Sequence, residues 1–161
     1  MAQAPKAGGP TAGDEAPTFD MATDTGRVSL AALKGRPLVL YFYPKDDTTG
    51  CTNEAKGFSE AKADFDKAGA LVIGCSKDTL ASHAKFRAKY DLTIALASDV
   101  DGKVIEAYGS WVEKSMYGRK YMGIDRSTFL MDGQGVLRRV WRKVKVPGHV
   151  QEVLKAVQDL G

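Results

Sequence analysis

The stretch RPLVLYFYPKDDTTGCTNE, residues 36–54, decides how this chain folds. Residues 36–43 form a continuous apolar and aromatic run, which is typical of a strand buried on both faces of a sheet. Pro44 ends the run, because proline has no amide to donate to a neighbouring strand. Apolar side chains then recur at helical spacing and predict a helix over residues 52–68, with its inner face at Ala55, Phe58, Ala61 and Phe65.

The same strand-then-helix scheme repeats downstream. Residues 69–74 predict a second buried strand, and residues 79–90 predict a helix that Asp78 or Thr79 could cap. The remaining elements that we expect are a short strand at 93–98, a hairpin of 127–131 and 136–144 around a glycine-rich turn, and an amphipathic helix at 150–160. This order predicts a single-domain α/β fold of the thioredoxin-like kind, a mixed sheet flanked by helices, with a right-handed crossover between its parallel strands.

Length and composition fit one soluble domain. The chain has 161 residues, of which 43% are hydrophobic and 27% charged. Its net charge of +3 is too small to indicate nucleic-acid binding, and its longest apolar run is too short to span a membrane. Residues 1–15 are rich in Ala, Gly and Pro and have no signal-peptide pattern, so we expect a flexible leader before a domain at 16–161.

The two cysteines, Cys51 and Cys75, indicate functional thiols in a reducing cytoplasm. They are too few for a disulfide scaffold or a tetrahedral thiolate zinc site. The two histidines, His83 and His149, stand far apart and are expected to be helix-start or packing residues. Residues 99–102, DVDG, read as a turn into a short helix because no glutamate follows at calcium-loop spacing. We therefore expect no metal and no other cofactor.

Cys51 falls where the first buried strand gives way to its helix. Sites in open α/β sheets collect at the carboxyl ends of strands, and the amides and dipole of a first helical turn stabilise a thiolate. Thr48 offers a hydroxyl three residues earlier, and Pro44 stiffens the loop and can shield the sulfur from water. Placement alone also allows an inert cysteine at a glycine-led helix start.

The spacing Pro44-x-x-x-Thr48-x-x-Cys51 resembles the active-site signature of the peroxiredoxins. The wider sequence is similar to the PrxQ or bacterioferritin-comigratory-protein subgroup over roughly residues 16–161. The segments that carry this resemblance are YFYPKDDTTGCTNE (41–54), SH (82–83), MYG (116–118), GIDRSTFL (123–130) and WRKVKV (141–146).

The resemblance implies that the Cys51 thiolate attacks the terminal peroxide oxygen and becomes a sulfenic acid, while water or an alcohol leaves. Thr48 would hydrogen-bond the peroxide and Pro44 would shape the pocket. Arg126 and the amides of Gly50 and Cys51 would stabilise charge on the sulfur and the oxygens. Glu54, one turn after Cys51, either orients an arginine or is only a carboxylate favoured by the helix dipole.

The sequence departs from its relatives where the sulfenic acid must be reduced. Many members of the subgroup carry a second, resolving cysteine five residues after the first, and others carry it on the following helix; this chain has Lys56 and Arg87 at these two positions. Cys75 remains as a possible resolving thiol near the same sheet edge, or as a small buried core residue. We expect a one-cysteine cycle in which thioredoxin, glutaredoxin or a small thiol reduces Cys51 directly, and a monomer.

Thiol–disulfide exchange and redox sensing are the alternatives on the same fold, and the absence of Cys-x-x-Cys disfavours the first. Basic residues crowd positions 138–145, which a solvated edge strand explains as well as an acidic partner does. Trp111 and Tyr117 are expected in a long loop, 109–122, where they would flank the pocket mouth or anchor the loop.

Overall fold

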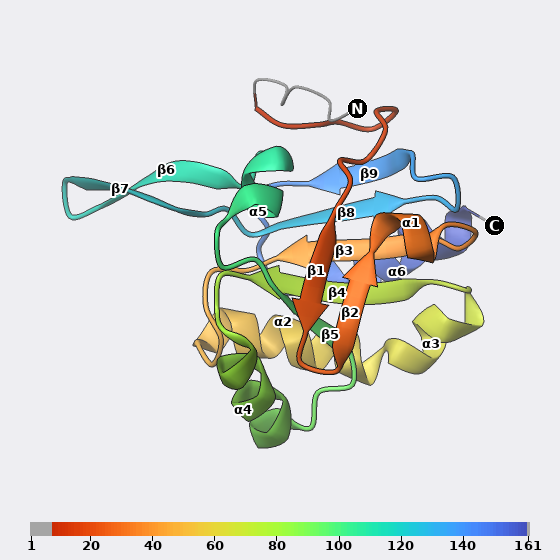
Figure 1. Cartoon of the computed structure of the whole chain (residues 1–161), viewed down its shortest axis with the longest axis horizontal. Coiled ribbons are helices and arrows are strands. Elements are labelled where there is room, and N and C mark those ends of the chain that lie inside the picture. The colour runs from red at the N-terminus through yellow and green to blue at the C-terminus, as the bar shows by residue number, and fades with distance from the viewer. Residues whose placement is uncertain (1–7, 161) are drawn as a thin grey trace.

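A computed structural model describes residues 8–160. Its centre is a seven-stranded mixed sheet in the order β2-β1-β5-β4-β3-β8-β9 (Figure 1). The strands are β1 (Asp20–Thr23), β2 (Gly26–Ser29), β3 (Leu38–Phe42), β4 (Leu71–Ser76), β5 (Ala95–Ser98), β8 (Ser127–Met131) and β9 (Leu137–Trp141). β3, β4 and β5 run parallel, whereas β8, β9, β1 and β2 pair antiparallel with their neighbours. The predicted mixed sheet is therefore confirmed.

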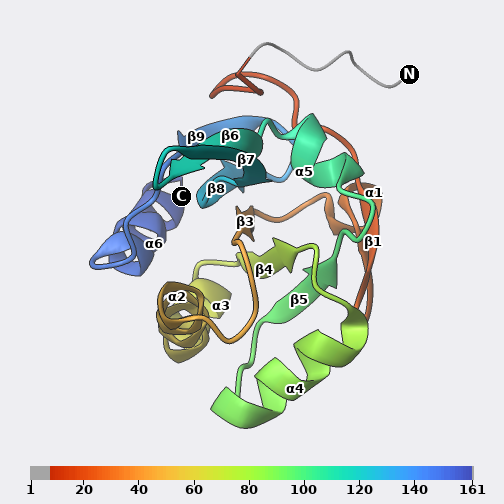
Figure 2. The same ribbon diagram turned by 90° about the vertical axis from the view of Figure 1, so that its left-hand side faces the viewer.

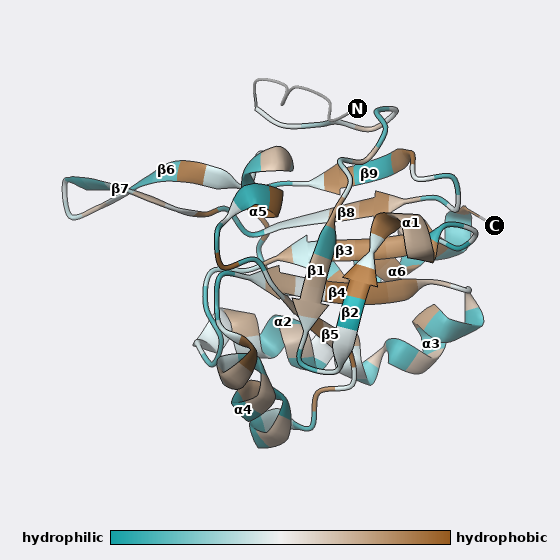
Figure 3. Ribbon diagram, viewed as in Figure 1, coloured by the Kyte–Doolittle hydropathy of each residue, from teal (hydrophilic) through white to brown (hydrophobic). Residues whose placement is uncertain are grey.

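Helices cover both faces of this sheet (Figure 2). On one face lie α2 (Thr49–Glu60), α3 (Lys62–Lys67), α4 (Leu80–Tyr90) and α6 (His149–Asp159), and on the other lie α1 (Leu30–Leu33) and α5 (Lys103–Ala107). β3 contributes to the cores on both faces: Val39 and Tyr41, with Tyr43 just after the strand, enter the first hydrophobic core, and Leu38, Leu40 and Phe42 enter the second. Alternate side chains of a strand point to opposite faces, so a strand apolar throughout must lie between two cores. Figure 3 shows the resulting concentration of hydrophobic residues on the central strands.

Several element boundaries differ from the sequence prediction. The helix expected at 52–68 is two helices, because Ala61 (φ −87°, ψ 0°) departs from helical geometry between the end of α2 at Glu60 and the start of α3 at Lys62. The second strand is shifted, and β4 continues through Cys75 to Ser76. Thr79 rather than Asp78 caps α4, accepting a hydrogen bond from the Ser82 amide. The β1–β2 hairpin and α1 were not predicted.

The prediction that residues 109–122 form a loop is wrong. Those residues form a separate hairpin of β6 (Trp111–Met116) and β7 (Arg119–Ile124), which projects from the body of the molecule (Figure 1). Tyr117 and Gly118 both have positive φ, at 52° and 78°, as the tight turn of a hairpin requires. Tyr117 lies at the tip and is 98% exposed, so it anchors nothing, whereas Trp111 lies at the base under the Lys77 ammonium.

The prediction of a flexible leader over residues 1–15 is corrected for residues 8–15. Residues 1–7 lie outside the described residues, but residues 8–15 are held against the end of the sheet. The Gly13 amide donates to the Leu137 carbonyl (2.7 Å), and the Leu137 amide donates to the Asp14 carbonyl (2.9 Å). Gly9 packs against Gly109 so closely that a side chain on either would collide with the other. Backbone pairing of this kind does not need apolar residues, so composition did not reveal it.

Among the described residues, no helix is both long and apolar enough to cross a membrane.

Candidate active site

Cys51 lies in the first turn of α2, at the end of the loop that follows β3. The first amide bonded within this helix is that of Thr52, which donates to the Thr48 carbonyl (2.8 Å). The preceding amides, including those of Gly50 and Cys51, keep their N–H groups free of helical partners. The thiol is 1% exposed in the first core, so it is shielded from bulk water beside a row of amide donors. The sequence prediction placed it in this turn.

The side chain of Arg126 contacts Cys51 from a distant part of the sequence. It sits between β7 and β8, where its carbonyl accepts from the Val144 amide (2.9 Å). Its Nη2 donates to the Cys51 Sγ (3.3 Å), and its Nη1 donates to Glu54 Oε1 (2.7 Å). Gly50 leaves room for this contact, since a Cβ there would lie 3.1 Å from Arg126 Nη2. The structure thus brings together the cysteine and arginine that the sequence singled out, 75 residues apart.

Glu54 is the carboxylate that orients this arginine. Its side chain is fully buried, and burial raises its pKa to about 7 despite the hydrogen bond and charge of Arg126. Burial would lower the pKa of Arg126, but the neighbouring Glu54 and Cys51 outweigh that effect and raise it. The second carboxylate oxygen of Glu54, Oε2, has no hydrogen-bond partner among residues 8–160. The guanidinium is therefore a fixed cation shared between a carboxyl group and the sulfur.

Thr48 and Pro44 lie on the exposed side of the same loop. Thr48 is the N-cap residue of α2, but its hydroxyl donates to the Lys45 carbonyl (2.8 Å) instead of capping the helix. The Oγ1 oxygen keeps lone pairs, so it can accept a hydrogen bond from the O–H of a hydroperoxide. No hydrogen bond joins Thr48 to the sulfur within residues 8–160.

Two aspartates between Pro44 and Thr48 hold the loop against α4, and the sequence reasoning missed both. Asp46 is buried and contacts His83 Nδ1 (2.7 Å) through its Oδ2. Asp47, in a left-handed conformation (φ 61°), accepts from Lys89 Nζ (2.8 Å) and from the Tyr90 hydroxyl (2.6 Å). A Lys-Asp-Asp sequence before a cysteine could have suggested anchoring, but only the fold brings α4 within reach.

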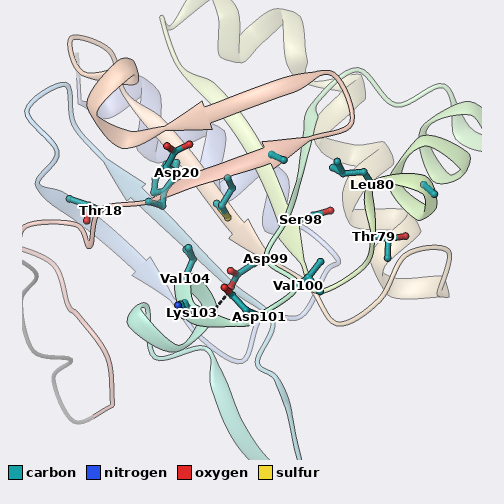
Figure 4. Close-up of a pocket in the computed structure, with 14 residues that line it drawn as sticks. Thr18, Asp20, Thr79, Leu80, Ser98, Asp99, Val100, Asp101, Lys103 and Val104 are labelled. Atoms are coloured by element: carbon teal, nitrogen blue, oxygen red, sulfur yellow. Dashed lines mark hydrogen bonds between the residues drawn. The ribbon is translucent and has the colours of Figure 1, made fainter.

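A groove of about 1020 Å³ lies elsewhere, between β1, β5, α4 and α5 (Figure 4). It includes neither the cysteine nor the arginine of the site. One of its carboxylates, that of Asp99, accepts from the Ile105 amide (2.8 Å) and so stabilises the start of α5. The described residues contain no group of three or more His, Cys, Asp and Glu side chains that could hold a metal ion.

Comparisons with known proteins show the family of the chain. The model of the AhpC/TSA family matches residues 12–140. The chain belongs to this family, the peroxiredoxins. It is 52% identical over 143 residues to a putative peroxiredoxin of Coxiella burnetii, covering 88% of this chain and 95% of that one. It is 44% identical over 149 residues to the Bacillus subtilis peroxiredoxin Bcp, covering 92% and 95% of the two chains.

Solved structures place the chain in the expected subgroup. Peroxiredoxin Q of Xanthomonas campestris superposes with a TM-score of 0.84 at 43% identity, covering 88% of this chain and 90% of that one. The thioredoxin-like fold and the PrxQ or bacterioferritin-comigratory-protein resemblance are both confirmed. As a peroxiredoxin, the protein is a thiol-dependent peroxidase.

The second cysteine of this peroxiredoxin lies on the other side of the sheet from the first. Cys75 is opposite Phe42 in the β3–β4 pairing and points into the second core, where its Sγ donates to Met21 Sδ (3.6 Å). Burial, with the charge of Asp99, raises the pKa of Cys75 well above its ordinary value. β3 and β4 do end at the same edge of the sheet, as the sequence indicated. Cys51, however, lies in the core on one face of the sheet, and Cys75 lies in the core on the other face.

The two positions where the resemblance led us to look for a resolving cysteine have other roles here. Lys56 is exposed on α2. Arg87, on α4, donates through Nη2 to Asp24 (3.0 Å) and through Nη1 to the Leu92 carbonyl (2.6 Å). Because the Asp24 carboxylate is 1% exposed, Arg87 is the counter-ion of a buried charge.

Proposed function

We propose that Cys51 is the peroxidatic residue and that this peroxidase works by a one-cysteine cycle. The observation that carries the proposal is the contact of Arg126 Nη2 with the Cys51 sulfur at 3.3 Å, beside the free amides of the α2 N-terminus. A cation and a row of aligned donors around a buried sulfur favour the thiolate and then the negative charge that moves onto the departing oxygen.

The first step forms a sulfur–oxygen bond and breaks the peroxide bond. The Cys51 thiolate displaces RO⁻ from ROOH and takes the terminal OH, so that sulfur is oxidised to a sulfenic acid and the peroxide is reduced. The leaving oxygen takes a proton and departs as water or an alcohol. Thr48 Oγ1 accepts from the peroxide O–H, the Arg126 guanidinium and the Gly50 and Cys51 amides donate to the oxygens, and Pro44 limits the entry of water.

The second half of the cycle uses an external thiol. One thiol condenses with the sulfenic acid to a mixed disulfide and releases water, and a second thiol then displaces Cys51 as a thiolate. Three features support this route over an internal disulfide: the placement of Cys75 in the opposite core, its buried and protonated thiol, and the occupation of both resolver positions by Lys56 and Arg87.

We propose hydrogen peroxide and alkyl hydroperoxides as substrates, since the Xanthomonas relative, at 42% identity, is described by its alkyl peroxide reduction. Thioredoxin, glutaredoxin or a small thiol serves as reductant, and the protein acts as a cytoplasmic monomer.

The experiment joins stopped-flow kinetics with mass spectrometry. Reduced protein and its C51S and C75S variants are mixed with hydrogen peroxide or tert-butyl hydroperoxide without added thiol, then trapped and mapped. We expect fast oxidation of the unmodified protein and of C75S, none at position 51 in C51S, and a Cys51 sulfenic acid beside a free Cys75. Oxidation of Cys51 no faster than that of free cysteine would overturn the peroxidatic role, and a Cys51–Cys75 disulfide would overturn the one-cysteine cycle.

A further inference from the structure

His83 is fully buried, and both of its ring nitrogens face hydrogen-bond acceptors. Nε2 lies 2.9 Å from the Ala97 carbonyl of β5, and Nδ1 lies 2.7 Å from Asp46 Oδ2. A carbonyl can only accept, so Nε2 carries a proton. The carboxylate already accepts from the Tyr43 hydroxyl at Oδ1 (2.6 Å) and from the Ser82 hydroxyl at Oδ2 (2.8 Å). An ionised carboxylate with these donors leaves Nδ1 to donate as well, which makes His83 an imidazolium.

The charged groups around this ring are all acidic. Asp46 faces it from the loop after β3, and Asp78 acts on it from the loop after β4. Tyr43 at the end of β3, Ser82 on α4 and the β5 carbonyl complete its polar surroundings. Burial alone would lower the pKa of His83, but the hydrogen bond and charge of Asp46, the carbonyl and Asp78 together raise it. Within residues 8–160, the nearby charges therefore favour the protonated ring.

The anchored aspartate stands in the loop that presents the reactive sulfur. Asp46 lies midway between β3 and α2, five positions before Cys51. Its backbone amide donates to Asp78 Oδ2 (2.8 Å), so both its main chain and its side chain are fixed. The loop path sets where Thr48 sits and where the α2 amides point. A shift of this loop would therefore move the whole peroxide-binding surface relative to Arg126.

We propose that His83 is a positioning residue for the peroxide reaction: its imidazolium holds Asp46, and with it the 44–50 loop, in the form that reacts, and loss of its proton releases that loop. The proposal rests on the proposed function, because it takes Cys51 as the attacking group. Loss of the proton removes the positive charge that attracts the Asp46 carboxylate, and it leaves one ring nitrogen with a lone pair facing an acceptor, either Asp46 Oδ2 at 2.7 Å from Nδ1 or the Ala97 carbonyl at 2.9 Å from Nε2.

The direction of the pH effect follows from the raised pKa of His83. A cation favoured by the fold contributes stability that is fully present below the unfolded pKa, about 6.5, and that is lost as pH rises through the folded value. Loop order and the peroxide rate constant should therefore fall together at alkaline pH.

Two substitutions of His83 distinguish the effect of where its hydrogen-bond donor lies from the effect of ring protonation. In H83N the amide nitrogen falls near the place of Nδ1 and donates to Asp46 without titrating, whereas in H83Q the donor falls near the place of Nε2. We expect H83N to keep a near-normal peroxide rate constant at neutral pH and to lose the alkaline fall. H83Q should be slower by about 10- to 100-fold at neutral pH, because a misplaced reactive loop costs rate steeply. H149N is the matched control and should keep the alkaline fall, since His149 bonds Thr128 on β8 instead of this loop.

A measurement on the unmodified protein does not depend on variants folding or on peroxidase activity. The chain has two histidines, so nitrogen-15 NMR of the imidazoles needs only H149N for assignment. We expect the His83 ring to carry protons on both nitrogens at pH 7, and the protection of the amides of residues 45–50, corrected for base-catalysed intrinsic exchange, to fall as that ring titrates. A neutral His83 at pH 7, an alkaline fall that persists in H83N, or loop exchange indifferent to its titration would overturn the proposal. Absence of peroxide reactivity in a protein with the expected NMR signature would instead overturn the proposed function.

Discussion

Arg126 contacts the sulfur and a carboxyl group through different nitrogens, so one side chain fixes both the charge at the site and its own position. The planar fork of a guanidinium reaches Cys51 and Glu54 simultaneously, whereas the single ammonium of a lysine cannot keep both contacts. We expect R126K to react with hydrogen peroxide about 100- to 1000-fold more slowly, which is the usual effect of removing one donor to developing negative charge. Stopped-flow rate constants measure this change. R138A, at an exposed strand position, is the control, and a loss below tenfold in R126K would contradict the role.

Glu54 gives this site a pH-dependent stability of its own. Burial raises its pKa from about 4.5 to about 7, so the folded protein binds a proton that the unfolded chain has released in this interval. The contribution of Glu54 to folding stability therefore falls as pH rises from 4.5 to 7.

The test of this effect is E54Q, which keeps an acceptor for Arg126 but cannot ionise. We expect the stability of E54Q relative to the unmodified protein to increase between pH 5 and 8. Urea unfolding at several pH values measures the difference, and E152Q on α6 is an exposed control. Parallel stability curves for E54Q and the unmodified protein would exclude the effect.

At the scale of elements, the sequence was most informative where a segment is buried. β3 was predicted because every one of its residues enters a core, and α2 because its apolar residues recur at helical spacing. The β6–β7 hairpin was missed because both its faces are largely exposed, so no apolar alternation marks it, and only the Tyr117-Gly118 turn pointed to it. Cys51 and Arg126 were found through their sequence context. The Asp46–His83 contact was not, because it depends on where α4 packs.

At the start of α2, we expect a substitution of Gly50 to affect activity and stability differently. Gly50 has a helical position and leaves space that an alanine Cβ would partly fill, 3.1 Å from Arg126 Nη2. We expect G50A to fold with equal or greater stability, by up to about 1 kcal/mol, because alanine is the better helix residue. Its peroxide rate constant should fall by about tenfold, since the guanidinium must move. Kinetics and thermal unfolding of the same sample test both parts. K56A on the same helix is the control, and an unchanged rate in G50A would show that the guanidinium adapts.

Across the whole molecule, the sheet separates the two cysteines, and Arg87 joins α4 to one segment distant in sequence and to the chain just after α4. From α4 it reaches Asp24 in the β1–β2 turn and the Leu92 carbonyl before β5. A charged side chain with 1% exposure, such as Asp24, has lost its water and depends on this partner. At one of the two positions where the sequence resemblance implies a resolving thiol, this chain therefore has a residue that its fold requires.

This dependence predicts a large loss of stability when Arg87 is removed. R87A should lower the free energy of unfolding by about 3 to 5 kcal/mol, the usual cost of leaving one buried charge unpaired. The double variant D24N/R87A should recover most of that loss, because a neutral amide needs no counter-ion. R27A is the matched control: Arg27 pairs with Asp20 on the same hairpin (2.9 Å), but both side chains are exposed, so screening by water leaves little to lose. Denaturant unfolding of the unmodified protein, R87A, D24N/R87A and R27A measures these differences in stability. If R87A is no less stable than R27A, then the arginine is not a structural replacement for the thiol, and its position carries no constraint against restoring a cysteine there.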